Sequence, residues 1–522
     1  MDNAKTEVVL IQPSNSVTGS FIKMLPIGLL YASSEIVKKG VKVHILDLRF
    51  QHLTWKNALS KVVNDRTLIV GITVMTGVAI SDSLNISQFV KANYPGVYVV
   101  WGGPHPTSNP RGILSEHSID FLIRGYGSEP FLQLYNNLTE AKDAAGLNTI
   151  PGLSYRDSHG SAIDNEPANT FEFIDYRDIP YHLIADFSMY KHMDTNEKVF
   201  PMYSVMGCPY KCAFCSSPAQ YAKIGKKWQP YSITEVVSHI KMVQETYGAT
   251  YIYFIDDDSF VDLRHVEAII DELARLDIKV KLGFRGARIN EIIKMSDEFI
   301  KKLVDAGTNS MHVGVESGSD RLLTLMKKNT TVEQILEVNR KLAKHPSLKV
   351  FYNFIVGFPT ETIEETTMTR DLILKLIEDN PSCYIIPLNK PRPLPGTGLY
   401  ELALKHGYKG PETLHQWADY EVESSNYKPV WLTDEHNMFI RMMFLSMYFI
   451  DDKIFKLSET HSFKYALLKG MASLYKPVAM FRFSRGVHRF LFEDYLYGLY
   501  SKTEDLVRLL SKIPSTVKQE KS

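Results

Sequence analysis

Three of the four cysteines in this 522-residue chain lie in the segment Ser204-Val-Met-Gly-Cys208-Pro-Tyr-Lys-Cys212-Ala-Phe-Cys215-Ser-Ser-Pro218. Their spacing, Cys-x3-Cys-x2-Cys, lets three thiolates surround one small inorganic object, and it leaves one iron of a four-iron cluster open for another ligand. Zinc would require a fourth ligand with its own local spacing, and no second Cys-x2-Cys or His pair lies nearby. A disulfide would leave one cysteine of the segment over. We therefore expect Cys208, Cys212 and Cys215 to hold a 4Fe-4S cluster.

A strand–helix alternation surrounds this segment. Apolar runs predict strands at 201–206, 250–255, 279–284, 310–315, 350–356 and 382–388, with helical stretches between them. Six such steps make most of a triosephosphate-isomerase-type barrel, open on one side, whose chemistry would sit at the carboxyl ends of the strands. Charged residues follow three of these strands, namely 256–258, Arg285 with Arg288, and Glu316. The aspartates could cap a helix and the arginines could be surface charges, whereas Glu316 is expected to point into the barrel mouth.

A second alternation occupies residues 1–145. Strands are expected at 8–11, 41–47, 68–74, 97–101 and 121–123, again separated by helices, which predicts a doubly wound parallel sheet. Ligands of such sheets bind at the carboxyl ends of the strands, where glycines let the backbone approach a large ligand. The turns at these ends contain the candidate binding residues Thr73, Gly102, Gly103, His105, Gly125 and Glu129. The Gly-x-Gly-x-x-Gly fingerprint does not follow the first strand, so a dinucleotide is disfavoured.

These motifs resemble those of one large subgroup of the radical S-adenosylmethionine (SAM) superfamily. Cys208-x3-Cys212-x-Phe214-Cys215 is similar to the superfamily signature, and the segments 314–318 and 355–359 look like its fourth- and fifth-strand motifs. Three further pieces resemble the cobalamin-binding domain that precedes the barrel in this subgroup: Pro26-x-Gly28-Leu29, Gly102-Gly-Pro-His105 and Gly125-Tyr-Gly-x-Glu129. The resemblance covers roughly residues 5 to 400. The Asp-x-His-x-x-Gly motif of mutase-type cobalamin domains does not occur in residues 1–150, so cobalt would have no His ligand from below.

The resemblance implies three cofactors and a radical mechanism. The thiolates would hold the cluster, its open iron would bind SAM, and reductive cleavage of SAM would give a 5′-deoxyadenosyl radical. Phe214 would pack near the adenine, Glu316 and Ser317 would contact SAM, and Gly357 would leave room for its base. The candidate residues of the first sheet would bind cobalamin, with His105 at the cofactor's periphery. Electrons would come from an external donor of the flavodoxin or ferredoxin type.

The sequence divides into four expected parts. These are a cobalamin-binding domain at 1–145, a linker with a small hairpin at 146–195, the radical SAM barrel at 196–395 and a mostly helical region at 396–522. The last part is dense in aromatic residues and could wall the substrate cavity. Cys383 is expected to be a buried small hydrophobe on the last barrel strand.

Composition limits the partners of the chain. A hydrophobic content of 44%, a charged content of 23% and a net charge of zero are those of an ordinary globular protein without a field for nucleic acid. No signal-peptide pattern and no run of about twenty uncharged apolar residues are present, so we expect a reducing cytoplasm. The basic and aromatic segments 481–485 and 488–490 could contact a membrane surface, or simply form a solvated helix face.

Four functions are compatible with these observations. The first is a cobalamin-dependent radical SAM enzyme that methylates an unactivated carbon of a small or medium-sized organic substrate. The second is a radical cyclase, oxidase or rearrangement enzyme of the same architecture. The third is a methylthiotransferase that acts on tRNA. Such an enzyme normally carries a second three-cysteine site and a basic domain, whereas this chain has only Cys383 outside the cysteine segment. The fourth is a non-catalytic module that binds the cluster or cobalamin, against which the polar ends of the six strands argue.

Overall fold

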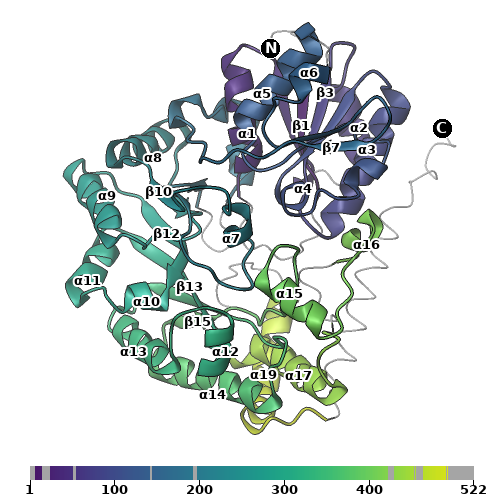
Figure 1. Cartoon of the computed structure of the whole chain (residues 1–522). Coiled ribbons are helices and arrows are strands. Elements are labelled where there is room, and N and C mark those ends of the chain that lie inside the picture. Colours follow the sequence, from purple (N-terminus) through teal and green to yellow (C-terminus); the bar gives the residue numbers. More distant parts are fainter. Residues whose placement is uncertain are drawn as a thin grey trace, which may run out of the picture.

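The computed structural model describes residues 6–14, 24–50, 54–141, 144–191, 197–420, 428–451, 453, 463–489 and 491. Within these residues, two sheets follow one another along the chain, each with its own helices, and a further group of helices completes the molecule (Figure 1). This is the α/β architecture that the sequence predicts.

The first sheet has seven strands in the order β2-β1-β3-β4-β5-β6-β7. Its strands are β1 (Val8–Gln12), β2 (Val43–Asp47), β3 (Ile69–Thr73), β4 (Tyr98–Gly102), β5 (Phe121–Ile123), β6 (Leu153–Arg156) and β7 (Ala162–Asp164). The first five strands are parallel. The last two form the hairpin that the sequence places in a linker, and this hairpin extends the sheet as two antiparallel strands.

Helices cover both faces of the first sheet. They are α1 (Ile27–Lys38), α2 (Trp55–Val62), α3 (Val78–Asn93), α4 (Pro104–Ser108), α5 (Ser128–Asn136) and α6 (Ala144–Leu147). Along β1, Val8 and Leu10 belong to the core that α1 and α5 cover, whereas Val9 and Ile11 belong to the core that α2 and α3 cover. A strand buried on both faces reads as a continuous apolar run, which is why the sequence predicted a parallel sheet here.

The second sheet is an open barrel of six parallel strands in the order β15-β14-β13-β12-β11-β8. The strands are β8 (Val199–Met202), β11 (Tyr251–Phe254), β12 (Lys281–Arg288), β13 (Thr308–Glu316), β14 (Lys349–Phe354) and β15 (Cys383–Ile385). The terminal strands β8 and β15 each pair with one neighbour only, so the barrel is open between them. This confirms the predicted partial barrel.

One predicted strand is divided in two. The sequence indicates a single strand at 201–206, but β8 ends at Met202, and β9 (Val205–Gly207) pairs instead with β10 (Trp228–Pro230) in an antiparallel ribbon. The break occurs where Ser204 turns toward the barrel and donates to Asp256. The cysteine segment therefore leaves from a short ribbon at the barrel rim.

Most of the barrel helices begin after residues that local capping rules favour. They are α7 (Ser217–Gln220), α8 (Ile233–Tyr247), α9 (Leu263–Arg275), α10 (Ile289–Ile292), α11 (Asp297–Asp305), α12 (Asp320–Leu325), α13 (Val332–Ala343) and α14 (Ile363–Asp379). Ser232, Thr331 and Thr362 each form a capping box at the start of their helix. Such a box satisfies two backbone groups that a helix end would otherwise leave without partners.

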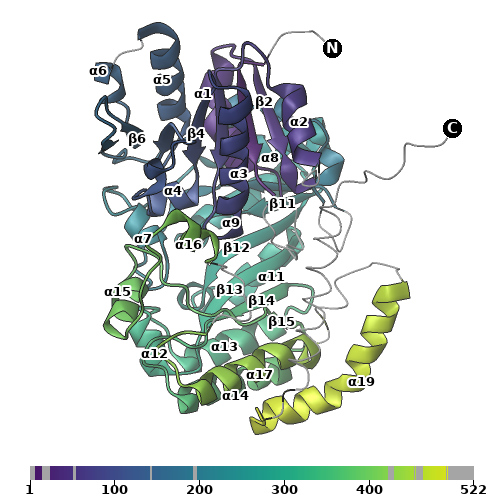
Figure 2. The ribbon, with the colours of Figure 1, turned by 90° about the vertical axis from the view of Figure 1, so that its right-hand side faces the viewer.

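The described part of the C-terminal region is helical, as predicted. It contains α15 (Gly398–Lys405), α16 (Leu414–Ala418), α17 (Asp434–Ile450) and α19 (Phe463–Arg485). Two views show α16 beside the first sheet and α17 beside the barrel, while α19 lies at the lower end of the molecule (Figures 1 and 2). Trp417 of α16 belongs to the same core as Ile80 and Leu84 of α3.

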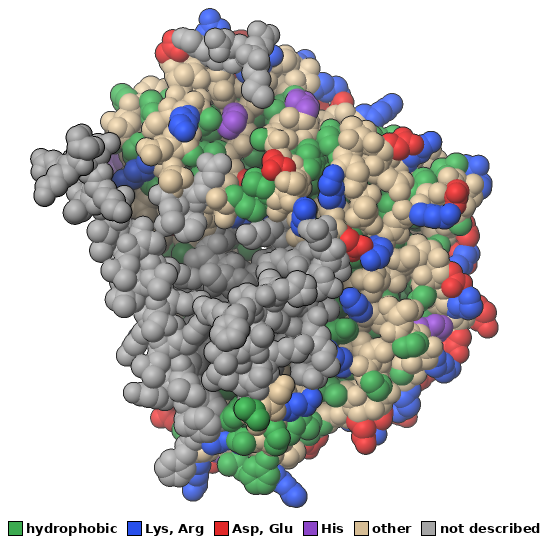
Figure 3. Space-filling view, turned by 180° about the vertical axis from the view of Figure 1, so that it is seen from behind, with side chains coloured by type: hydrophobic (Ala, Val, Ile, Leu, Met, Phe, Trp, Pro, Cys, Tyr) green, Lys and Arg blue, Asp and Glu red, His purple; other side chains and the backbone are tan. Residues whose placement is uncertain are grey.

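The surface carries both signs of charge. Acidic and basic side chains are interspersed on the face shown in Figure 3, and hydrophobic side chains gather at its lower end. On α19, Leu474 and Phe481 are exposed to 83% and 60%. Among the described helices, none combines the length and the apolar character needed to span a bilayer.

Candidate functional site

Asp256 fixes the start of the cysteine segment. This residue follows β11 and is completely buried. Its carboxylate accepts hydrogen bonds from the backbone nitrogens of Ser204 and Val205, at 2.8 and 3.1 Å, and from the hydroxyls of Ser204 and Ser259, at 2.6 and 2.8 Å. Burial raises the pKa of Asp256 to about 6, against the effect of these donors. One carboxylate therefore fastens the rim ribbon to the barrel sheet.

The three thiols of the segment lie at this rim, but within the described residues no three Cys, His, Asp or Glu side chains are arranged to hold a metal ion. Cys212 is buried, Cys208 and Cys215 are partly buried, and the backbone nitrogen of Cys215 donates to the carbonyl of Cys212 at 3.2 Å. Burial raises the pKa of Cys208 to about 12 and also raises that of Cys215. Thiols in such surroundings become thiolates when a metal replaces the proton. Three thiolates are the kind of donor set that an iron–sulfur cluster takes, so cluster binding by these cysteines stays a prediction.

Arg288 contacts the segment from β12. Its Nη1 donates to the Sγ of Cys212 at 2.9 Å, and its Nη2 donates to the carbonyl of Lys328 at 2.6 Å. The guanidinium lies 3.9 Å from the ring centroid of Tyr210. A charged donor forms a stronger hydrogen bond than a neutral one, so Arg288 fixes the position of the Cys212 sulfur.

A pair of buried acids lies next to this arginine. The Tyr210 hydroxyl donates to Glu291, and both Asp258 and Glu291 are buried. Burial, with the charge of Glu291 as the next cause, raises the pKa of Asp258 well above its usual range. Asp258 therefore keeps its proton to a higher pH than an exposed aspartate does.

The predicted SAM residues Glu316 and Ser317 lie at the end of β13. Glu316 has a φ of 72°, in the left-handed region that a non-glycine residue adopts only where its surroundings enforce it. Its Oε1 is 2.9 Å from Nζ of Lys328, and both side chains are buried, with 8% and 6% exposed. Lys328 is also 5.9 Å from the ring centroid of Phe214. The structure thus brings Glu316 and Phe214 to the same lysine.

Gly357 lies against the C-terminal region. A φ of 86° explains the glycine, but a Cβ placed there would lie 3.1 Å from side-chain atoms of Leu432 and Ile440. Its carbonyl accepts from Nε1 of Trp431 at 2.8 Å. Residues of the C-terminal region therefore pack over the end of β14 beside Gly357, and its place next to the SAM base stays a prediction.

Glu361 closes the turn after β14 and makes stability depend on pH. Its carboxylate accepts from the backbone nitrogens of Gly357 and Phe358, at 2.6 and 2.7 Å, and from the Thr366 hydroxyl at 2.7 Å. Burial raises its pKa from 4.5 to about 7. Between these values the folded chain binds more protons than the unfolded chain, so stability falls as pH rises.

We predict that the free energy of unfolding decreases by about 3 kcal/mol over that pH window because of Glu361. The Glu361→Gln variant should lack this decrease, and Glu364→Gln, at an exposed position three residues on, should keep it. Denaturant unfolding of the three proteins at both ends of the window provides the measurement. Equal pH slopes in wild type and Glu361→Gln would contradict the prediction.

A cavity of about 490 Å³ lies between the two sheets. The first sheet contributes strand-end residues that include Thr73, Gly102, Gly103 and Gly125, all predicted as candidates. The barrel contributes residues from the ends of β8, β11 and β12, including Tyr203, Asp257 and Arg285. The carboxyl ends of the two sheets therefore share one cavity.

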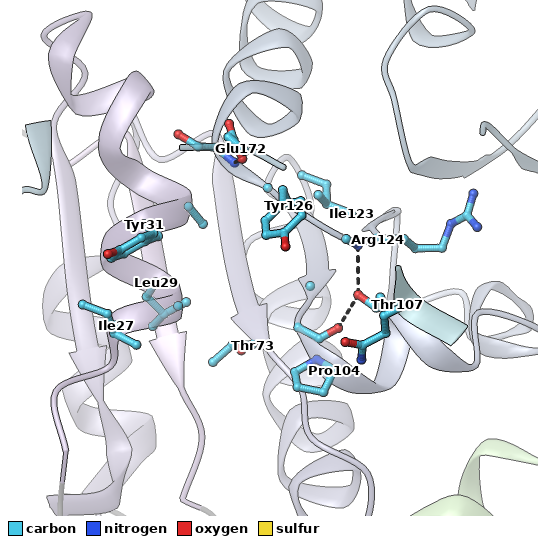
Figure 4. Close-up of a pocket in the computed structure, with 18 of the residues that line it drawn as sticks. Ile27, Leu29, Tyr31, Thr73, Pro104, Thr107, Ile123, Arg124, Tyr126 and Glu172 are labelled. Atoms are coloured by element: carbon cyan, nitrogen blue, oxygen red, sulfur yellow. Dashed lines mark hydrogen bonds between the residues drawn. The ribbon is translucent and has the colours of Figure 1, made fainter. Parts of the chain in front are cut away.

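The wall on the side of the first sheet is a narrow backbone cradle. Gly103 has a φ of 95°, and a Cβ there would lie 2.7 Å from Oγ1 of Thr73. Thr107 donates to the carbonyl of Gly103 at 2.8 Å and accepts from the backbone nitrogen of Gly125 at 3.0 Å, as the dashed lines in Figure 4 show. Tyr31 of α1 and Tyr126 of the turn after β5 also line the cavity (Figure 4). A wall of bare backbone in a cavity with aromatic rings fits a large flat ligand such as a corrin ring.

Two predicted residues do not line the cavity. His105 begins α4 and is buried on the other side of the turn, where Nδ1 lies 3.0 Å from the Thr76 hydroxyl and the ring lies 5.8 Å from that of Trp417. Burial lowers its pKa to about 4. Glu129 is exposed on α5, and its side chain accepts from Gln133.

Sequence reasoning missed other residues at this site. The sequence places Asp257, Arg285 and Arg288 after predicted strands, but it leaves open whether they are site residues or merely turn and surface charges. Tyr203 and Lys328 had no pattern that could have indicated them. Asp257 accepts from the hydroxyls of Ser217 and Tyr221, at 3.0 and 2.7 Å.

Known families match the two halves of this arrangement. Residues 202–373 match the Radical SAM superfamily, and residues 22–135 match the B12 binding domain. The chain is therefore a radical SAM enzyme with a B12-binding domain ahead of its barrel. Its cofactors are a 4Fe-4S cluster, SAM and cobalamin.

Similar proteins give this class more detail. An uncharacterized methyltransferase of Pyrococcus horikoshii is 28% identical over 84% of this chain and 91% of its own length. The anaerobic magnesium-protoporphyrin IX monomethyl ester cyclase of Rubrivivax gelatinosus is 26% identical over 63% of this chain and 59% of its own. The radical SAM methyltransferase TsrM from Kitasatospora setae, solved with cobalamin and a 4Fe-4S cluster, has the same fold, with a TM-score of 0.61 at 19% identity over 83% of this chain and 82% of TsrM. The chain is thus a cobalamin-dependent radical SAM enzyme.

Proposed function

We propose that this enzyme transfers a methyl group to an unactivated carbon of a small or medium-sized organic substrate. The observation that carries the proposal is a cavity that the strand ends of both sheets line together. A substrate there would face the cobalamin domain and the barrel at once. The methyltransferase relative, which aligns over most of both chains, supports this reaction. TsrM has been solved with tryptophan, which agrees with a substrate of this size.

The chain's own residues would have distinct tasks. When bound, the three cofactors supply an electron, an organic radical and a transferable methyl group. Cys208, Cys212 and Cys215 would hold the cluster, and Arg288 would fix the position of the Cys212 sulfur. The Thr73 and Gly103 cradle would hold the corrin. An external reductant would supply the electrons.

Other residues would control the environment of the radical. Asp257 holds the hydroxyl of Tyr221 at the cavity wall, so that this ring stays in one orientation. Burial raises the pKa of Tyr203 to about 12 and keeps its hydroxyl protonated. Rigid aromatic walls exclude water, which protects a reactive intermediate from side reactions.

A radical cyclisation is the second candidate, and the similarity to the anaerobic cyclase favours it. One experiment separates the two functions. The reconstituted enzyme is incubated anaerobically with a reductant, a metabolite extract and SAM whose transferable methyl group is deuterated. We expect 5′-deoxyadenosine together with a product that carries the deuterated methyl group. Formation of 5′-deoxyadenosine with an unlabelled, ring-closed product would overturn methylation in favour of cyclisation.

A further inference from the structure

Arg285 stands on a bulge that turns its side chain out of the barrel sheet. Phe284 of β12 pairs with Met311 of β13, but Ala287 pairs with Val313. The stretch between the paired positions is one residue longer in β12 than in β13, which is the definition of a bulge. Bulges next to active sites re-aim one side chain, and here Arg285 is exposed in the cavity between the two sheets.

The neighbouring turn fixes this bulge in place. A Cβ at Gly286 would lie 2.5 Å from the carbonyl oxygen of Asp257 and 2.9 Å from that of Asp256, so only glycine allows this close approach. The backbone nitrogen of Ser259 donates to the carbonyl of Gly286 at 3.3 Å. The backbone that carries Arg285 is therefore held by the same turn whose Asp256 fastens the cysteine segment.

The guanidinium has no partner within the described part of the chain. No ion pair or hydrogen bond joins Arg285 to another described residue, while the acids around it are already engaged. Asp256 accepts from two serines, and Asp257 accepts from Ser217 and Tyr221. The other arginine of the cavity wall, Arg124, points away from the cavity and donates to the carbonyl of Asn165 (Figure 4).

We propose that Arg285 binds an anionic group, a carboxylate or a phosphate, of the organic substrate in the shared cavity. The inference rests on the proposed function, which places that substrate between the two sheets. A guanidinium offers a planar fork of donors that matches both anions in two parallel hydrogen bonds. Arg285 is on the barrel side of the cavity, opposite the Thr73 and Gly103 cradle, so it would orient the substrate beneath the corrin.

The test uses inorganic phosphate as the probe and needs no turnover. The holoenzyme is prepared with paramagnetic cob(II)alamin and an oxidised, diamagnetic cluster, and the ³¹P relaxation rate of added phosphate is measured. Phosphate bound near cobalt relaxes faster, so wild type should show a saturable enhancement. In Arg285→Gln this enhancement should fall by about tenfold or more, because the variant lacks a charged hydrogen bond to phosphate and such a bond contributes at least that factor to affinity. Arg285→Lys should retain part of it, because an ammonium keeps the charge without the fork.

Controls keep the proposal falsifiable. Arg264→Gln removes an exposed arginine of α9 that pairs with Asp262 at 3.0 Å, and should leave the enhancement unchanged. Neutral trimethyl phosphate should show no enhancement. Equal enhancement in wild type and Arg285→Gln, or none in wild type, would overturn the proposal. Loss of the enhancement when SAM is added first would assign Arg285 to the SAM carboxylate and also overturn it. The electron paramagnetic resonance signal of cob(II)alamin verifies cofactor loading in each variant, and methyl transfer is scored separately by the deuterium experiment.

Discussion

Substitution of any one of Cys208, Cys212 and Cys215 by Ala should reduce 5′-deoxyadenosine formation to the level found without protein. Three thiolates are the minimum that leaves one iron open for SAM while holding the other three. Cobalamin uptake should persist, because its proposed cradle lies on a separate sheet, around Thr73 and Gly103. Iron content, 5′-deoxyadenosine and bound cobalamin are measured on each anaerobically reconstituted variant.

Cys383→Ala is the matched control for this series. Cys383 lies on β15, is fully buried, and its Sγ is 3.6 Å from the carbonyl of Leu376. The structure confirms the predicted buried position. This variant should keep its iron and its activity, with a small loss of stability from the vacated volume. A loss of cobalamin together with the cluster in the first three variants would show that the two halves do not bind their cofactors independently.

Gly103→Ala should remove most of the cobalamin affinity and spare the cluster. The added Cβ would lie 2.7 Å from Oγ1 of Thr73 and 3.0 Å from the backbone nitrogen of Val74, so the cradle must open. We expect affinity to fall by about tenfold or more, since even 1.4 kcal/mol of distortion corresponds to that factor. Titration of the protein with cobalamin, followed by its absorption spectrum, gives the affinity, and iron analysis reports the cluster.

Gly112→Ala separates steric crowding from backbone strain. Gly112 also has a positive φ, 80°, but a Cβ there would meet nothing within 4 Å. Both substitutions strain the backbone, and only the first crowds the cavity wall. Equal losses of cobalamin affinity in the two variants would refute the steric explanation.

Periodic features of the sequence were sufficient to predict the two sheets and half of the candidate site. Apolar runs and capping residues predict the strands and helices, and the ends of parallel strands gather on one edge of a sheet. For this reason Thr73, Gly102, Gly103 and Gly125 could be grouped in advance, and the structure places all four around one cavity. The cysteine segment could be identified in the same way, because its three cysteines lie close together in the sequence.

The rest of the site depends on contacts between segments that are distant in sequence. Lys328 meets Glu316 only because the chain returns through α12, and no local pattern marks that lysine. The bulge that exposes Arg285 arises from a register shift against β13, which a single strand does not reveal. The contacts of Gly357 with Leu432 and Ile440, from far along the chain, could not be predicted from its local motif either.

Residues 394–420 and 428–432 have a consequence for protein engineering. The backbone of Leu399 donates to the carbonyl of Ala213, in the cysteine segment, at 2.8 Å. Trp417 packs with α3 of the first sheet, and Trp431 donates to Gly357 of the barrel. These described residues therefore contact both halves of the molecule. A chimera that takes either half from a relative must also take those of these residues that contact that half. Otherwise these residues no longer fit one of the two halves, and the halves lose the contacts that set their relative position.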